Sequence, residues 1–189
     1  MTFSALILAG GQSRRMGRDK AFLEVDGLPL LARQIDLARR AGAVTIFISG
    51  RPDRDYGRFG VPVLHDRVAN AGPLAGIAQG LAAATTPFLL VLAVDLPRMT
   101  PDFIGRMAEA CTSGTGVVPQ LLDQLEPAAA IYPKEARAIA ENCLASGAYA
   151  LRALVEALEA QGAMRRLRVD PQYADELFNW NESSTEAGQ

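Results

Sequence analysis

The run Phe88 to Val94 consists of seven apolar residues in succession. A strand with one face in water alternates apolar and polar residues, so this run indicates a strand that is covered on both faces. Coverage on both faces is typical of a mostly parallel sheet that lies between layers of helices. The run is also too short to cross a membrane as a helix, which takes about 20 apolar residues. The sequence therefore favours an α/β fold with this strand near the centre of its sheet.

Predicted strands and helices alternate along the rest of the chain, judged by apolar periodicity and by Pro and Gly at the element ends. We expect strands over 5–8, 44–49, 61–64, 88–93, 116–120, 126–132 and 166–169, and helices over 29–41, 73–84, 100–111, 134–144 and 149–160. No repeat or linker interrupts this pattern, so we predict one domain over residues 1–181 and a frayed tail over 182–189. The fold class that this order predicts is a doubly wound, mostly parallel α/β sheet.

Composition and charge exclude several classes of partner. The 189 residues carry a net charge of −2, which provides no broad positive surface for a nucleic acid. Arg14 and Arg15 are followed by charged residues instead of the apolar segment that an export signal requires. Cys111 and Cys143 are too few and too isolated for a disulfide framework or a zinc site. We expect a cytoplasmic protein that acts on a small molecule, with no nucleic acid and no membrane as partner.

A glycine-rich, basic loop follows the first predicted strand. Gly10 and Gly11 allow the backbone to come close to a ligand. The cationic side chains that come next are Arg14, Arg15, Arg18 and Lys20. The loop lacks both the Gly-Lys-Ser/Thr of a Walker loop and the Gly-x-Gly-x-x-Gly of a dinucleotide site. Because ligands of such sheets bind at the carboxyl ends of the strands, we interpret this loop as a cradle for a triphosphate; the alternative is a solvated basic turn.

A lone carboxylate follows the central strand. Asp95 comes directly after the apolar run and precedes Leu96-Pro97, which places it at the rim of the sheet. An aspartate before Leu-Pro is also typical of a turn. Nucleotide-bound Mg²⁺ takes few protein carboxylates, because the phosphates supply other oxygens. Together with the basic loop, Asp95 predicts a site for Mg²⁺, or for Mn²⁺ in its place.

Several segments, in order along the chain, resemble one known family. Leu8-Ala9-Gly10-Gly11-x-Ser13-x-Arg15-Met16-Gly17-x-Asp19-Lys20 resembles the signature of the MobA-type molybdenum cofactor guanylyltransferases, which are nucleotidyltransferases with a Rossmann-like fold. Asp66, the turn from Gly72 to Gly76 and Asp95-Leu96-Pro97 also match, and residues 178–181 are similar to the family's C-terminal Asn-x-Asn strand. After Asn181 the chain departs from the Thr-Pro-Glu that is usual in the family, so no role is carried beyond that residue.

The resemblance implies that the chain transfers GMP from GTP to the terminal phosphate of molybdenum-molybdopterin and releases pyrophosphate. Molybdoenzymes, their chaperones and other proteins of cofactor biosynthesis are the protein partners that it implies. The nucleotide site that it implies is formed by Leu8, Ala9, Gly10, Gly11, Lys20, Ser49, Asp66, Gly72, Gly76 and Asp95. In this set the backbone of residues 8–10 would meet guanine, Lys20 the phosphates and Asp95 the Mg²⁺. Asn179 and Asn181 would face the pterin.

A reaction of this class needs charge stabilisation more than it needs a base. The acceptor phosphate is already an anionic nucleophile at neutral pH, so the single histidine, His65, is not required. The predicted catalytic groups are Lys20, Arg15, and Asp95 with its cation. They would stabilise the charge on the α-phosphoryl group and on the departing pyrophosphate.

Two alternatives stay open on the residues alone. A molybdopterin cytidylyltransferase, or a nucleotidyltransferase for a sugar or isoprenoid phosphate, would share the fold and the basic loop. A nucleotide-binding regulatory or adaptor protein would keep the site without turnover, although binding alone does not require both Lys20 and Asp95. Within the resemblance, the Leu-Ala-Gly-Gly of residues 8–11 favours guanylyl transfer, because the cytidylyl enzymes have Leu-Ala-Ala-Gly there.

Overall fold

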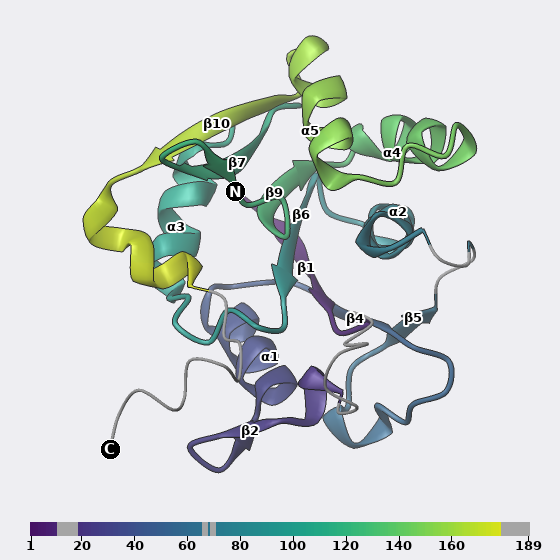
Figure 1. Cartoon of the computed structure of the whole chain (residues 1–189), viewed down its shortest axis with the longest axis vertical. Coiled ribbons are helices and arrows are strands. Elements are labelled where there is room, and N and C mark those ends of the chain that lie inside the picture. Colours follow the sequence, from purple (N-terminus) through teal and green to yellow (C-terminus); the bar gives the residue numbers. More distant parts are fainter. Residues whose placement is uncertain (11–18, 66–67, 69–70, 179–189) are drawn as a thin grey trace.

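The computed structural model describes residues 1–10, 19–65, 68 and 71–178 (Figure 1). Its strands are β1 (Phe3–Leu8), β2 (Glu24–Val25), β3 (Leu28–Pro29), β4 (Ile46–Gly50), β5 (Val63–His65), β6 (Phe88–Ala93), β7 (Gly116–Leu121), β8 (Gln124–Leu125), β9 (Ala129–Pro133) and β10 (Met164–Val169). Its helices are α1 (Leu30–Arg40), α2 (Pro73–Ala83), α3 (Pro101–Ala110), α4 (Ala136–Ala145) and α5 (Leu151–Ala160), with 3-10 turns η1 (Lys20–Phe22), η2 (Gly57–Phe59) and η3 (Pro171–Leu177). The strands and helices that the sequence predicts are confirmed, with ends that differ by a few residues.

The main sheet has the strand order β10-β7-β9-β6-β1-β4-β5, with β8 paired to β7. β6, β1, β4 and β5 run parallel to one another, and β10 runs parallel to β7. β9 lies between β7 and β6 and is antiparallel to both. The predicted α/β fold with a mostly parallel sheet is therefore confirmed. The central strand β6 has one parallel neighbour, β1, and one antiparallel neighbour, β9, which the sequence analysis did not anticipate.

The length of the connection explains the direction of β9. Parallel neighbours need a crossover of about a dozen residues or more, usually through a helix. Only residues 122–128 separate β7 from β9, and they include β8. The chain therefore reverses after β7, and β9 enters the sheet against the direction of β6. As a result, the residues that precede β9 lie at the same edge of the sheet as the residues that follow β6.

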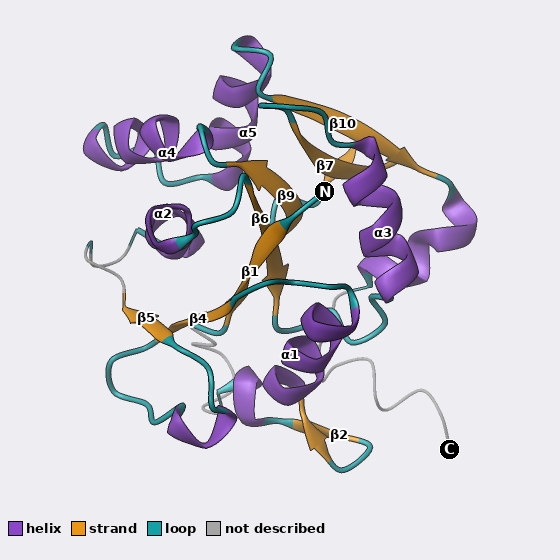
Figure 2. Cartoon of the chain, turned by 180° about the vertical axis from the view of Figure 1, so that it is seen from behind, coloured by secondary structure: helices purple, strands orange, loops and turns teal. Residues whose placement is uncertain are grey.

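Helices cover both faces of this sheet, with α1 and α3 on one side and α2, α4 and α5 on the other (Figure 2). Leu90 and Leu92 of β6 belong to the core cluster that includes residues of α1 and α3. Leu89 and Val91 belong to the cluster that includes residues of α2, α4 and α5. All four side chains are fully buried. This burial on both faces is the physical reason that β6 contains no polar residue.

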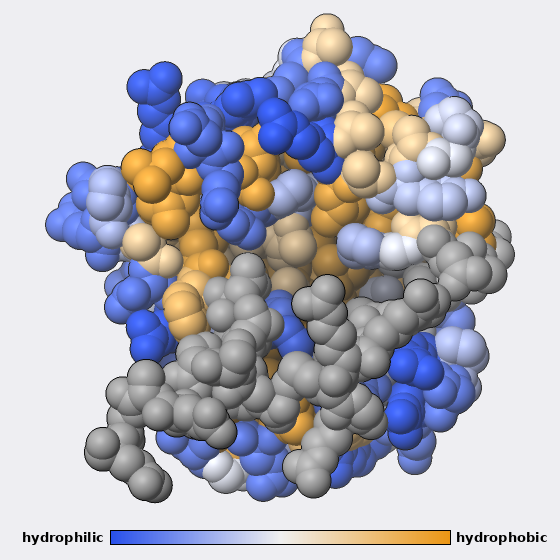
Figure 3. All heavy atoms as spheres, viewed as in Figure 1, coloured by the Kyte–Doolittle hydropathy of each residue, from blue (hydrophilic) through white to orange (hydrophobic). Residues whose placement is uncertain are grey.

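The surface carries both hydrophobic and hydrophilic side chains (Figure 3). On the face seen in Figure 3, hydrophobic side chains lie in several groups among hydrophilic ones. Among the residues that the structure describes, no helix combines the length and the apolar character needed to span a membrane.

Cys111 and Cys143 are unpaired thiols, and burial raises the pKa of Cys111 to about 11, so this thiol is protonated at neutral pH.

Candidate active site

The carboxyl ends of β6, β1 and β4 lie side by side at one edge of the sheet (Figure 1). In the register of these parallel strands, Leu8 pairs with Ala93 on one side and with Ser49 on the other. The residues that continue past the three strands therefore start from neighbouring positions. This edge is where ligands bind in doubly wound sheets.

Lys20 and Asp95 meet at this edge. Lys20 Nζ donates to Asp95 Oδ2 at 2.8 Å, although the two residues are 75 positions apart in the chain. Their side chains are 21% and 22% exposed, so solvent and ligands reach both. The structure thus brings together the cation and the carboxylate that the sequence analysis selected from two separate loops.

Lys20 opens η1, a single 3-10 turn that the sequence analysis did not predict. The turn is capped by Asp19, whose Oδ1 accepts a hydrogen bond from the Ala21 N–H at 3.1 Å. Ala21 itself is fully buried against the core. Capping and burial anchor the end of the glycine-rich loop, and this anchoring directs the lysine toward Asp95.

A second carboxylate, which the sequence analysis missed, lies near Asp95. Leu92 pairs with Ala129, the Ala93 N–H donates to the Ala128 carbonyl at 2.7 Å, and the Ala129 N–H donates to the Glu126 carbonyl at 2.9 Å. Glu126 therefore opens the turn that leads into β9, at the edge of the sheet where Asp95 follows β6. Burial raises the pKa of Glu126, and the negative charge of Asp95 raises this pKa further. The sequence signal was the short β7–β9 connection, which requires an antiparallel return and brings Glu126 to this edge.

The chemistry of these donors suits a small divalent cation. Carboxylate oxygens are the protein ligands that Mg²⁺ and Mn²⁺ prefer. Among the described residues, no three His, Cys, Asp or Glu side chains lie together as a metal-binding group. A cation at Asp95 would therefore need further oxygens from a phosphate ligand, which is the usual arrangement for nucleotide-bound Mg²⁺.

The backbone of residues 8–10 is partly engaged in the sheet. The Leu8 carbonyl accepts a hydrogen bond from the Val94 N–H at 3.2 Å, and the Ala9 N–H donates to the Ser49 carbonyl at 2.9 Å. Gly10 comes next, and its φ is not in the left-handed region. A Cβ at Gly10 would lie 3.7 Å from the Ser49 carbonyl oxygen and 3.9 Å from Arg51 Cγ, which are ordinary contacts. Among the described residues, neither backbone strain nor crowding therefore requires glycine at this position.

Ser49 and Gly76 have packing roles in the structure, and Gly72 has a conformational one. Ser49 is 5% exposed, and a Cβ at Gly76 would overlap its Oγ and approach Leu8 Cδ2 to 3.3 Å. Gly76 therefore allows α2 to pack closely on β1 and β4. Gly72 precedes α2 with φ 62° and ψ −154°, a conformation that is essentially restricted to glycine. The structure explains all three residues without a ligand, and their contact with a nucleotide stays a prediction.

Some predicted site residues lie outside the described residues: Gly11, Arg15, Asp66, Asn179 and Asn181. The last described residue, Phe178, lies under the Arg98 guanidinium at 5.1 Å from its ring centre. Just before it, Glu176 accepts hydrogen bonds from the Thr100 hydroxyl at 2.6 Å and from the Thr100 N–H at 3.2 Å. The described chain thus ends against the loop that follows Asp95.

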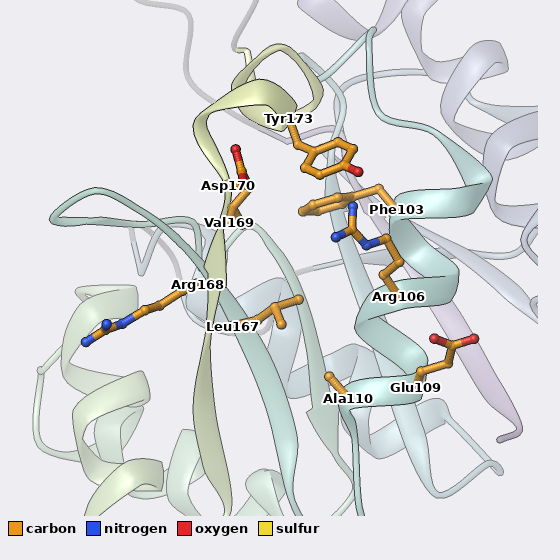
Figure 4. A pocket seen from close by; sticks show the side chains of 9 residues that line it. All are labelled: Phe103, Arg106, Glu109, Ala110, Leu167, Arg168, Val169, Asp170 and Tyr173. Atoms are coloured by element: carbon orange, nitrogen blue, oxygen red, sulfur yellow. The ribbon is translucent and has the colours of Figure 1, made fainter.

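A separate cavity of about 330 Å³ lies between α3, β10 and η3 (Figure 4). Its lining includes Phe103, Leu167 and Tyr173, with the Arg106 guanidinium stacked 4.1 Å from the Tyr173 ring centre. None of the predicted site residues that the structure describes lines it. The cavity is therefore distinct from the Lys20–Asp95 edge.

Known proteins are similar to this chain in sequence and in fold. The family model described as a MobA-like NTP transferase domain matches residues 5–168. A protein of Opitutus terrae named as a probable molybdenum cofactor guanylyltransferase is 40% identical over 178 residues, which cover 93% of this chain and 88% of the relative. The solved structure of molybdopterin-guanine dinucleotide biosynthesis protein A from Archaeoglobus fulgidus aligns with a TM-score of 0.76 at 19% identity, over 94% of this chain and 92% of that one. A Mycobacterium tuberculosis protein solved in complex with manganese aligns with a TM-score of 0.64 at 17% identity, over 90% and 89% of the two chains.

Proposed function

The chain belongs to the family of MobA-like NTP transferase domains, and from this premise we propose that it transfers GMP from GTP to the terminal phosphate of molybdenum-molybdopterin. Pyrophosphate is the second product. The observation that carries the proposal is the contact of 2.8 Å between Lys20 and Asp95, since it joins the cation and the carboxylate that this reaction requires. The names of the relatives support guanine as the base and molybdopterin as the acceptor.

Asp95 is the residue that would hold a divalent cation, Mg²⁺ or Mn²⁺, with Glu126 as the neighbouring carboxylate. The manganese in the Mycobacterium tuberculosis structure of the same fold supports a divalent ion at such a site. When bound, the cation supplies positive charge to the phosphate oxygens of the nucleotide. Lys20 holds Asp95 Oδ2, and this bond fixes the orientation of the carboxylate and leaves its second oxygen for a ligand.

Lys20 also carries the positive charge that would face the phosphates. It donates hydrogen bonds to oxygens on which negative charge builds when the bond to pyrophosphate breaks, and this stabilisation lowers the barrier. Arg15, which lies outside the described residues, is proposed to add a second positive charge. The acceptor phosphate is anionic at neutral pH and attacks the α-phosphoryl group without a protein base.

The remaining contacts are proposed from the resemblance. The nucleoside would be surrounded by Leu8, Ala9, Gly10, Gly11, Ser49, Asp66, Gly72 and Gly76. The pterin would be contacted by Asn179 and Asn181. Because the Leu8 carbonyl and the Ala9 N–H are engaged in the sheet, the backbone contact with guanine falls mainly on Gly10. We further propose that residues 1–181 form the transferase domain, that the protein acts in the cytoplasm, and that molybdoenzymes or their chaperones receive its product.

The test measures pyrophosphate release from purified protein, molybdenum-molybdopterin, Mg²⁺ and one of GTP, CTP, ATP or UTP. We expect release with GTP, and a loss of about 100-fold to 1,000-fold in kcat for Lys20→Ala and for Asp95→Asn. Arg137→Ala, which removes one member of an exposed ion pair with Glu141, is the matched control and should retain activity. Preferential release with CTP would overturn the guanylyl assignment, and nucleotide binding without any release would favour the regulatory alternative.

A further inference from the structure

Arg51 is the first residue past β4, and its side chain lies along Gly10. The distance from Arg51 Cγ to an ideal Cβ on Gly10 is 3.9 Å. Because Leu8 pairs with Ser49 in the parallel register, Gly10 and Arg51 continue from neighbouring strand ends. Arg51 therefore borders Gly10, a position at which the described part of the fold gives no reason to require glycine.

The Arg51 guanidinium is held in one orientation by Asp53. Nε donates to Asp53 Oδ1 at 2.9 Å and Nη2 donates to Oδ2 at 2.7 Å. This hydrogen-bonded pair raises the pKa of Arg51 and lowers the pKa of Asp53, so both groups stay charged. A guanidinium has five N–H donors, and the bonds to Asp53 engage two of them. The side chain is 36% exposed, so the remaining donors are accessible to a ligand.

The loop that carries this pair is itself anchored. The Arg51 N–H donates to Tyr56 Oη at 3.2 Å, and Tyr56 is 1% exposed. The Tyr56 ring stacks on Phe22 of η1 with ring centres 5.5 Å apart. Asp19, which precedes Lys20, contacts Arg54 of the same loop, with its Oδ2 3.7 Å from Arg54 Nε. Arg51 and Lys20 are thus held by the same packed unit, in a fixed relation to one another.

The strand order indicates which part of a nucleotide would reach Arg51. Asp95 follows β6, Gly10 follows β1 and Arg51 follows β4, and these strands are consecutive in the sheet. A nucleotide whose phosphates meet Lys20 and Asp95 can extend across β1 toward β4. Its base then lies beside Gly10, where the missing side chain leaves room for a planar group, and beside the free donors of Arg51.

We propose that Arg51 is a base-specificity residue, whose guanidinium donates hydrogen bonds to the O6 and N7 acceptors of guanine. This inference rests on the proposed function. Guanine presents two acceptors on that edge, whereas adenine presents one acceptor and one donor, and cytosine presents a donor. A donor group fixed at this place favours guanine and leaves adenine with an unmatched N–H. Asp53 is a positioning residue, since it holds the donors without touching the base.

The experiment measures equilibrium binding of GTP, ATP, CTP and 7-deaza-GTP, each with Mg²⁺, by calorimetry in the absence of the acceptor. The protein variants are wild type, Arg51→Ala, Asp53→Asn and the control Arg152→Ala, which breaks an exposed arginine–glutamate pair on α5. We expect Arg51→Ala to reduce the preference for GTP over ATP by about tenfold to a hundredfold. Wild type should bind 7-deaza-GTP more weakly than GTP, because the N7 acceptor is missing, and Arg51→Ala should abolish this difference.

Asp53→Asn should reduce the same preference by a smaller factor, and Arg152→Ala should leave it unchanged. Thermal unfolding of each variant without nucleotide shows whether Arg51→Ala is folded. If Arg51→Ala weakens GTP and ATP equally, or if it still discriminates against 7-deaza-GTP, the specificity role is overturned and the proposed function stands. Wild-type protein that does not prefer GTP to ATP and CTP would overturn both.

Discussion

Gln34 of α1 donates a hydrogen bond of 2.7 Å to the carbonyl oxygen of Leu96, the residue directly after Asp95. Gln34 is 2% exposed, so this bond is shielded from water. Among the described residues no group donates to Gln34 Oε1, so the amide serves the turn through its NH₂ group alone. A helix on one face of the sheet thereby fixes the turn that presents Asp95.

We expect Gln34→Leu to disturb the site more than the fold. The substitution leaves the Leu96 carbonyl without its partner, which costs about 1–3 kcal/mol, and the loss of the unpartnered Oε1 offsets part of that cost. The net loss measured by urea unfolding should therefore be about 1 kcal/mol. Since the Asp95 turn is no longer held, the Mg²⁺ concentration for half-maximal activity should rise severalfold. An unchanged Mg²⁺ requirement would show that the turn keeps its position without Gln34.

Glu126→Gln tests the effect of the negative charge near Asp95. The pKa of Glu126 is raised in the folded protein, so ionisation of this carboxyl group favours the unfolded state. The resulting loss of stability is fully present above the folded pKa. It is absent below the unfolded pKa, which is about 4.3. We expect Glu126→Gln to raise the Tm at pH 7 by no more than about 2–4 °C, because the carboxyl group is only half-buried and solvent screens its charge. The gain should disappear as the pH falls toward 4. Thermal unfolding of both proteins from pH 4 to pH 8 measures the difference, and a gain that grows toward low pH would contradict the prediction.

Gly10→Ala separates the requirements of the fold from those of the ligand. The added Cβ makes ordinary contacts of 3.7 and 3.9 Å, and Gly10 has no left-handed backbone conformation, so the Tm should change little. A methyl group beside the base should lower the ratio of kcat/KM for GTP to that for CTP by about 1–3 kcal/mol in free energy. Steady-state kinetics with both nucleotides measures this ratio. A constant ratio would show that the base does not approach Gly10.

Gly76→Ala, unlike Gly10→Ala, should lower the stability of the fold. The added Cβ would overlap Ser49 Oγ and lie 3.0 Å from Ser49 Cβ, within the closely packed layer between α2 and β4. Overpacking of this kind costs about 1–3 kcal/mol of unfolding free energy. Ser49→Ala in the same protein removes the overlapping oxygen and should restore part of the stability, which urea unfolding of the two single variants and the double variant measures. Additive losses would indicate that the two residues do not interact.

Local patterns in the sequence were sufficient for the order of elements and for two parts of the site. Residues 88–94 predicted the central strand because burial on both faces excludes polar side chains at every position. The absence of polar residues from this run can be read directly from the sequence. Lys20 and Asp95 were selected because each follows a buried strand, and strand ends of a parallel sheet converge on one edge. The ligand contacts of Ser49 and Gly76 were predicted from the family resemblance and stay predictions, and the structure shows that these two residues lie closely packed.

Contacts that depend on register and on helix packing were decided only by the tertiary structure. Glu126 comes near Asp95 because β9 enters the sheet antiparallel, so that the turn before β9 lies at the edge where Asp95 follows β6. The Gln34 bond to Leu96 and the position of Arg51 beside Gly10 likewise join segments that are distant in the chain. The periodicity of a segment reports which of its faces is buried, but not which neighbour buries it. The sequence therefore determined the strands, the helices and the chemistry of the two main loops, while sheet order and helix packing determined which side chains lie around the Lys20–Asp95 contact.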